Sequence, residues 1–191
     1  MEQIKDLNVY LNDDVKDTSV QKVIEDINKR FDEQEKWLNE ASNTSGIQME
    51  KLEKLLMPVK LNITTFGGSI YDGLRLYDFL SSHKGKIECI CEGYVMSAGT
   101  FIICAIPKEL RYARKNTRFL IHSLMSITLG KLQDMEEDIN ESRLLMETIK
   151  SIYTENTNMT MKELDDIVKN KVNLFFGSEE AIKKGLISKI I

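Results

Sequence analysis

The chain has 191 residues, 42% of them hydrophobic and 29% charged, which is typical of one globular domain with its own core. The formal net charge of −4 and the lack of a long basic run argue against a nucleic-acid-binding surface, because phosphate binding needs clustered Lys and Arg. The longest apolar stretch, around residues 98–107, is about half as long as a membrane-spanning helix, and residues 1–30 lack the basic start and apolar run of a secretory signal.

The N-terminal third is predicted to be mostly helical. Residues 8–11 predict a short strand. Thr18 and Gln21 have the spacing of a capping box and open a helix, which residues 43–46 end before a second, shorter helix. The chain is at its most charged between residues 32 and 57. We interpret that segment as a solvated helical excursion, with a docking surface for a partner as the alternative.

From residue 59 onward, strands are predicted to alternate with helices. Alternating apolar and polar residues predict a strand at 59–65, and further strands are predicted at 86–95, 111–113 and 118–122. Apolar residues three and four apart, with Ser69-x-x-Asp72 and Thr160-x-x-Glu163 as caps, predict helices at 69–85, 98–105, 132–153, from 160 onward and at 178–184. Strands separated by helices of this length imply parallel β-α units. We therefore expect an α/β fold in a single domain, residues 1–191, which carries the excursion at about 32–57.

One serine lies where a predicted strand meets a predicted helix, in the segment Gly93-Tyr94-Val95-Met96-Ser97-Ala98-Gly99. The first N–H groups of a helix have no partners inside it and point outward, where they can hold the oxyanion of a tetrahedral intermediate. A serine at such a junction is more often just the N-cap of the helix. The spacing is therefore compatible with a nucleophile or with a cap.

The two histidines lie in different settings. His122 ends the predicted strand at 118–122, where the apolar run stops. A serine hydroxyl needs a base within hydrogen-bond reach, and histidine has the proton affinity for that role. A hydrogen-bonded structural histidine is the alternative for His122. His83 follows a helix in a polar stretch, so we expect it to be a solvated C-terminal cap.

A pair of glycines, Gly67-Gly68, follows the predicted strand at 59–65. Paired glycines tolerate positive φ angles and let the backbone approach a ligand closely. They could supply a second donor to an oxyanion, together with a strand edge for an extended peptide. A plain turn is the alternative.

The three cysteines, Cys89, Cys91 and Cys104, lie in apolar segments. An odd number in such segments predicts reduced core thiols in a cytosolic protein, not a disulfide framework or a metal site. We therefore expect no metal and no cofactor, and a cytoplasmic location.

From about Pro58 to the C-terminus, the chain resembles the ClpP family, the proteolytic subunits of Clp proteases. Four ordered blocks carry the resemblance. They are Gly67-Gly68-Ser69-Ile70 with Asp72-Gly73-Leu74-Arg75-Leu76-Tyr77-Asp78; residues 93–99; Arg111-Tyr112-Ala113 with Asn116-Thr117-Arg118 and Ile121-His122; and Gly177-Ser178-Glu179-Glu180-Ala181 with Gly185-Leu186-Ile187. The resemblance implies a ClpP/crotonase-type β-β-α superhelix in which the predicted helix at 132–153 is the long handle.

The resemblance also implies roles for individual residues. It makes Ser97 the nucleophile and His122 its base, with the backbone N–H groups of Gly68 and Ala98 as the oxyanion hole. The triad Asp of the family falls on Asn173, counted from the Ser-Glu-Glu-Ala block. The residues implied to bind substrate are Gly67, Ser69, Ile70 and Ser123.

Asn173 is a departure from the family pattern. A neutral amide oxygen can accept a hydrogen bond from His Nδ1–H and hold the ring, but it lacks the negative charge that stabilises an imidazolium. We therefore expect a working but weakened site. Asp165 and Asp166, on the preceding helix, are candidate replacements for the missing carboxylate.

Two further departures flank the peptide groove. Thr64-Thr65-Phe66 replaces the family's Asn-Ser-Pro, and Ser123-Leu124 replaces its Gln-Pro. The substrate preference of the family is therefore not carried over to this chain.

The function implied by the resemblance is that of an ATP-dependent-type serine endopeptidase subunit. Such a subunit cleaves peptides or unfolded proteins through an acyl-enzyme inside a homo-oligomeric chamber, a heptameric ring or two stacked rings, served by an AAA+ unfoldase. One alternative is a weak or inactive ClpP-like ring subunit with a structural or regulatory role. A crotonase-type acyl-CoA enzyme, which shares the superhelix, is another alternative. Neither nucleic acid nor membrane is an expected partner.

Overall fold

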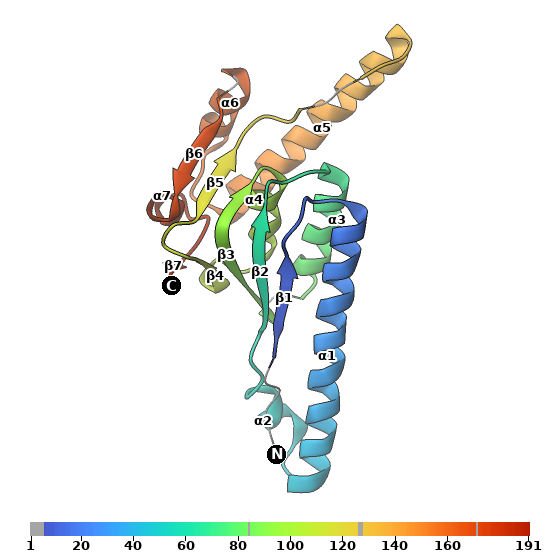
Figure 1. Ribbon diagram of the computed structural model, residues 1–191, viewed down its shortest axis with the longest axis vertical. Coiled ribbons are helices and arrows are strands. Elements are labelled where there is room, and N and C mark those ends of the chain that lie inside the picture. Colours follow the sequence, from blue (N-terminus) through green and yellow to red (C-terminus); the bar gives the residue numbers. More distant parts are fainter. Residues whose placement is uncertain (1–5, 84, 126–127, 171) are drawn as a thin grey trace.

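The computed structural model describes residues 6–83, 85–125, 128–170 and 172–191, and it contains one seven-stranded sheet with helices (Figure 1). The strands are β1 (Asn8–Leu11), β2 (Val59–Thr65), β3 (Ile87–Met96), β4 (Arg111–Ala113), β5 (Arg118–Ile121), β6 (Leu174–Gly177) and β7 (Lys189–Ile190). The α-helices are α1 (Asp17–Ser45), α2 (Met49–Glu53), α3 (Ile70–Ser81), α4 (Ala98–Ile102), α5 (Leu132–Asn156), α6 (Met161–Lys169) and α7 (Ser178–Lys183). Short 3-10 turns occupy Ile103–Ala105 and Lys108–Leu110.

The sheet divides along β3, its longest strand. The order β1-β2-β3-β4-β7 is parallel throughout, and β3 also pairs in parallel with β5. The first half of β3 pairs with β4 (Cys89 with Arg111), whereas its last residues pair with β5 (Met96 with Leu120). Because the last residues of β3 pair with β5, the segments that follow these two strands begin side by side.

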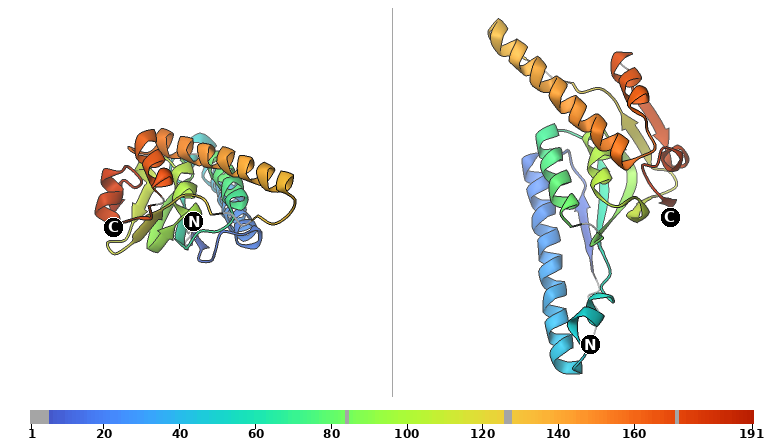
Figure 2. Two further views of the ribbon diagram at one scale, coloured as in Figure 1. Left: turned by 90° about the horizontal axis from the view of Figure 1, so that it is seen from above. Right: turned by 180° about the vertical axis from the view of Figure 1, so that it is seen from behind.

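Helices α1, α3, α4 and α5 lie on one side of the sheet (Figure 2). Every second side chain of β2, and of residues 87–91 in β3, points to those helices and is buried, as a half-covered strand requires. The opposite side carries polar pairs, among them Lys60 with Glu88 and Arg114 with Glu92. The large apolar core therefore lies between the sheet and its helices.

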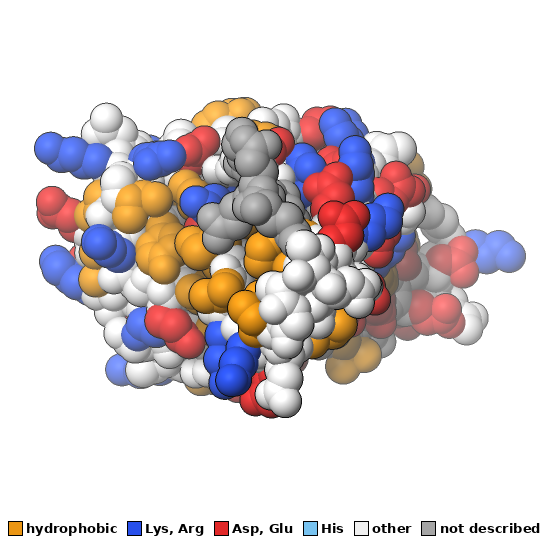
Figure 3. Space-filling model, turned by 90° about the horizontal axis from the view of Figure 1, so that it is seen from below, with side chains coloured by type: hydrophobic (Ala, Val, Ile, Leu, Met, Phe, Trp, Pro, Cys, Tyr) orange, Lys and Arg blue, Asp and Glu red, His pale blue; other side chains and the backbone are white. Residues whose placement is uncertain are grey.

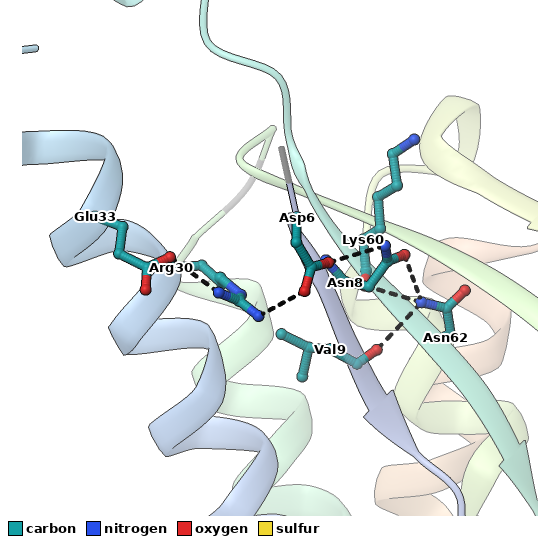
Figure 4. A network of polar contacts seen from close by, with 7 residues as sticks. All are labelled: Asp6, Asn8, Val9, Arg30, Glu33, Lys60 and Asn62. Atoms are coloured by element: carbon teal, nitrogen blue, oxygen red, sulfur yellow. Dashed lines mark hydrogen bonds and ion pairs between the residues drawn. The ribbon is translucent and has the colours of Figure 1, made fainter. Parts of the chain in front are cut away.

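A polar network fastens the β1 edge to β2 and α1 (Figure 4). Asn62 is buried within β2, and its Nδ2 lies within hydrogen-bond distance of Asn8 Oδ1 (3.1 Å) and of two backbone carbonyl oxygens. Arg30 of α1 reaches Asp6 Oδ2 at 3.1 Å and Glu33 Oε2 at 3.0 Å. These bonds supply partners for a buried amide that would otherwise destabilise the sheet.

The predicted excursion at 32–57 is helical, as expected. Helix α1 runs beyond the end of the sheet and stops at Gly46, whose φ of +68° is the left-handed conformation that ends helices (Figure 1). Leu38, Ala41 and Leu52 form a small apolar cluster of their own there, separate from the main core. From this end, hydrophobic side chains gather in the middle of the face with charged ones around them (Figure 3). The single-domain assignment and the docking alternative stay predictions.

The strands and helices predicted from residue 59 onward are confirmed, with ends shifted by a few residues. Two strands were not predicted. β6 pairs antiparallel with β5 (Leu174 opposite Ile121), and β7 adds a parallel edge next to β4. Neither shows the alternation of apolar and polar residues that predicts a strand, since β6 reads Leu-Phe-Phe-Gly and β7 has two residues. The expectation of parallel units alone was therefore incomplete.

The three cysteines are buried and free, as the sequence predicted. Burial raises the pKa of the Cys104 thiol to about 12. A thiol with so high a pKa is almost entirely protonated at neutral pH and therefore a poor nucleophile. These thiols belong to the core.

Candidate active site

Ser97 occupies a strained position between β3 and α4. Its φ and ψ are +51° and −123°, and it is the one non-glycine residue with positive φ in the described part of the chain. Hydrogen bonds hold its backbone on both sides: its N–H donates to Leu120 O (2.9 Å), and its carbonyl accepts from Thr100 N (2.9 Å) and Oγ1 (2.6 Å). Its side chain makes no capping hydrogen bond. Ser97 therefore stands at the N-cap position of α4, as one alternative expected, but its hydroxyl is not engaged by the helix.

A second layer supports this turn. Thr100 Oγ1 lies 2.6 Å from the hydroxyl of Tyr153, a buried residue of α5. Desolvation raises the pKa of Tyr153 far above its ordinary value, so the phenol stays protonated and able to donate. The long helix is thus tied to the serine turn through one buried hydroxyl pair, a link that sequence reasoning missed.

The two glycines fit closely behind the serine. Gly67 has φ +98°, and a Cβ there would lie 2.6 Å from Ser97 Cβ and 2.9 Å from Met96 O. Gly68 has φ +148°, and its Cβ would lie 2.3 Å from Val15 O. Val15 N–H donates to Gly67 O at 2.7 Å, so the turn is fixed between the segment that leads into α1 and the serine. Only glycine fits both positions, and the Gly-Gly pair is more than a plain turn.

Two backbone N–H groups that make no hydrogen bond within the described residues lie at the same cavity as the serine hydroxyl. The N–H groups of Gly68 and Ala98 donate no hydrogen bond to another described residue. Both residues line the same cavity as Ser97. Ala98 is the first residue of α4, where an unpaired N–H is expected. Two donors and one hydroxyl therefore border one space.

His122 lies directly after β5 and borders the same cavity. Met96 of β3 pairs with Leu120 of β5, and both strands run on from this pair toward the cavity. This pairing explains why Ser97 and His122 border the same space. No hydrogen bond joins Ser97 to His122 in this structure. Catalytic hydrogen bonds are often long before substrate binds, so the absence of this bond leaves the pair available.

Asn173 lies next to the last paired residue of β6. Ile121 pairs with Leu174 as the last pair of an antiparallel ladder, and the same register continued by one residue would set His122 opposite Asn173. Asn173 is exposed and has no hydrogen bond to His122. Asp165, a candidate replacement, instead lies 2.7 Å from Lys150 Nζ, and this contact argues against a role beside the histidine. Asp166, the other candidate, is exposed on α6.

The cavity has a volume of about 520 Å³. Three of the four predicted substrate-binding residues line it, namely Ser69, Ile70 and Ser123, whereas Gly67 lies behind Ser97 and shapes the turn. Helix α5 forms the opposite wall with residues that sequence reasoning did not assign to the site. The sequence does show an apolar stripe on this helix, formed by Met146, Ile149 and Tyr153. The family resemblance, however, implied that the helix is a handle and not a wall of the site.

His83 does not line this cavity. Its Nδ1 lies 2.9 Å from Phe79 O at the end of α3, and its ring stacks on Phe31 with centroids 5.1 Å apart. His83 thus caps the C-terminal end of α3, as the sequence predicted, but its ring is half-buried and not solvated as expected. His122 is therefore the histidine to consider for chemistry.

The described residues contain neither a candidate membrane span nor a candidate metal cluster. None of the helices there combines the length and the apolar character needed to cross a bilayer. No group of three or more His, Cys, Asp or Glu side chains there is arranged to hold a metal ion.

An α/β sheet whose central strand ends in a strained serine, next to free amides and a histidine, is typical of hydrolases that work by acyl transfer. Comparison with known sequences then identifies the family. The chain belongs to the Clp protease family, because the sequence model of that family, described as "Clp protease", matches residues 2–191. The resemblance to ClpP and the fold class that it implied are confirmed.

Two curated relatives are similar to this chain. The "ATP-dependent Clp protease proteolytic subunit" of Deinococcus radiodurans is 32% identical over 133 residues, which cover 70% of this chain and 64% of the relative. The "ATP-dependent Clp protease proteolytic subunit 3" of Rhizobium meliloti is 34% identical over 134 residues, which cover 70% of this chain and 67% of the relative. The matched segment thus spans about two thirds of each relative's length.

Proposed function

We propose that this chain is a serine endopeptidase subunit that cleaves peptide bonds through an acyl-enzyme on Ser97. The observation that carries the proposal is the strained Ser97 turn, where a hydroxyl without a capping bond borders one cavity with two free amides and His122. Membership of the Clp protease family supports the choice of peptides as substrates.

The proposed reaction has two halves, and His122 acts first as a base and then as an acid in each of them. His122 takes the proton of Ser97 Oγ as the oxygen attacks the peptide carbonyl, and the amides of Gly68 and Ala98 hold the resulting oxyanion. His122 then gives the proton to the leaving amine. A water molecule enters and loses its proton to His122 as its oxygen attacks the acyl carbon, and His122 then returns that proton to Ser97 Oγ as the acyl group leaves. Asn173 would accept from the second ring nitrogen of His122 and hold the ring in position.

An extended peptide would lie along the segment from Gly67 to Ile70. Backbone groups there can extend a strand-like pairing to the peptide, as in other proteins that bind peptides at a sheet edge. Phe66 is 61% exposed and stacks on Tyr94 with ring centroids 4.0 Å apart, which offers a flat apolar surface next to the cavity. Ser123 borders the same space from the histidine side.

We further propose that the chain works as a homo-oligomer, a heptameric ring or a double heptamer, with an AAA+ unfoldase supplying unfolded protein. The names of both relatives, which describe ATP-dependent proteolytic subunits, support this. The first half of α5 projects from the body (Figure 1) and exposes Leu132, Ile139 and Leu144, which suits association with other subunits. Free buried cysteines support a reducing compartment, the cytoplasm.

One experiment tests nucleophile and assembly together. Native protein treated with a fluorophosphonate is expected to gain one probe per subunit on Ser97, within a particle whose native mass corresponds to a ring or to two rings. The expected reactivity follows from the serine turn and its free amides. An assembled particle that never reacts, at any probe concentration compatible with solubility, would contradict the proposal.

A weak or inactive ring subunit remains the second candidate. Two observations favour it: a neutral Asn173 replaces the triad carboxylate, and no hydrogen bond joins Ser97 to His122. Such a subunit would assemble normally but would react slowly, and would act through an active partner. Full activity of the pure protein would eliminate this candidate.

Replacing Asn173 with aspartate is expected to raise kcat at least about tenfold. A carboxylate opposite His122 would stabilise the imidazolium that forms during acylation, and the reverse change in a trypsin-like enzyme costs about 10⁴ in turnover. Steady-state hydrolysis of a fluorogenic peptide measures the effect. Asn170→Asp, at the end of α6, makes the same charge change away from the cavity and should leave kcat unaltered. Equal kcat for Asn173→Asp and the wild type would remove Asn173 from the proposed triad.

A further inference from the structure

The cavity beside Ser97 has a long apolar wall. Ile70, Phe101, Leu145, Met146 and Ile149 line it, and the last three come from α5. A volume of about 520 Å³ is within the range of pockets that bind small ligands or large side chains. The pocket can therefore enclose the side chain of one substrate residue next to the serine.

Two carboxylates border the same pocket. Asp138 and Glu141 are three residues apart on α5, so they share one face of the helix. Tyr71 OH donates to Glu141 Oε1 at 3.0 Å and holds that carboxylate toward α3. No Lys or Arg is among the pocket-lining residues of the described chain. The mouth of the pocket is therefore negatively charged above an apolar wall.

We propose that this pocket selects peptides with a lysine or arginine at the residue that supplies the acyl group. This rests on the proposed function, because it assumes that Ser97 attacks the carbonyl of that residue. The methylene stem of such a side chain packs on an apolar wall while its charged end stays near carboxylates and water, which is how long cationic side chains commonly lie. Asp138 and Glu141 are the specificity-determining residues.

Other substrate side chains would complement only the apolar wall or only part of the charge of this pocket. A leucine or norleucine would contact the same wall but would leave both carboxylates with water alone. A glutamate would meet charge of its own sign. Because both carboxylates are exposed, screening limits the effect, and we expect about a tenfold preference for lysine over norleucine, corresponding to about 1.4 kcal/mol.

The test compares matched covalent probes. Peptidyl diphenyl phosphonates differing only in a lysine, norleucine or glutamate side chain are incubated with the full protein. Ser97 Oγ bonds to phosphorus, a phenol leaves, and intact-mass spectrometry gives the rate. The expected order is lysine, norleucine, glutamate, with the lysine preference falling as salt rises. Equal rates for lysine and norleucine would overturn the specificity while leaving Ser97 as the nucleophile.

Variants identify the groups responsible. The Asp138→Asn, Glu141→Gln double variant is expected to react with the lysine and norleucine probes at equal rates. Glu136→Gln removes one carboxylate from the same helix outside the pocket lining and should keep the tenfold preference. A double variant that keeps the preference would overturn the assignment to these carboxylates. A wild-type protein that reacts with neither the phosphonates nor a fluorophosphonate would overturn the proposed function, and this inference with it.

Discussion

Replacing Ser97 with alanine is expected to lower the rate of peptide hydrolysis by at least about 10⁴-fold. Loss of the nucleophile in other serine peptidases costs about 10⁶ in kcat, and the remaining activity comes from the oxyanion donors and from binding. The fold should survive, because only the backbone of Ser97 is hydrogen bonded, to Leu120 O and to Thr100. The change therefore separates chemistry from structure.

Hydrolysis of a fluorogenic peptide gives the rate, and circular dichroism with native mass reports fold and assembly. Ser45→Ala, at the far end of α1, removes one hydroxyl at a distance from the cavity and serves as the matched control. Wild-type hydrolysis by the Ser97→Ala protein would mean that the chemistry lies elsewhere. Loss of assembly in that variant would instead show a structural role for the hydroxyl.

Replacing Arg111 with methionine is expected to destabilise the protein by about 3–5 kcal/mol. Arg111 is 2% exposed, and its guanidinium donates to three backbone carbonyl oxygens: Ile106 at 2.6 Å, Asn156 at 2.8 Å and Cys104 at 3.0 Å. No carboxylate of the described residues lies within ion-pair distance of it. Methionine fills a similar volume but leaves all three carbonyls without a donor, and each costs about 1–3 kcal/mol when buried.

Urea unfolding at fixed protein concentration measures this change in the free energy of unfolding. Arg114→Met is the matched control, because Arg114 is half exposed and pairs only with Glu92; we expect a loss below about 1 kcal/mol there. Arg111→Lys keeps the charge but lacks the planar fork, so it should fall between the two. An unchanged midpoint for Arg111→Met would contradict the account of these three bonds.

Much of the fold followed from local patterns. The alternation of strands and helices after residue 59 was predictable because each element repeats its apolar residues at the period of its own backbone. β6 was not predictable in this way. Its four residues acquire their conformation from β5, more than fifty positions earlier in the chain, after α5 and α6 have reversed its direction. Pairing at that distance leaves no local signature.

The candidate site was partly predictable. Ser97 and His122 stand at strand ends, where parallel sheets commonly place reactive groups, and the family resemblance suggested Asn173. The wall that α5 contributes to the cavity was not predicted. An apolar stripe on a helix indicates that one face of the helix is covered, but it does not indicate which part of the protein covers that face. Arg111 was also missed, since an arginine at a strand start gives no sign that carbonyl oxygens will enclose it.

The strained backbone at Ser97 lowers the stability of the fold at the same position that supplies the proposed nucleophile. A serine in that conformation costs about 1–3 kcal/mol, whereas glycine adopts it freely and gives back only part of the difference through the greater freedom of its unfolded chain. A directed-evolution campaign that rewards heat resistance alone would therefore favour a glycine there and discard the hydroxyl. Any effort to make this protein more robust has to screen for turnover as well.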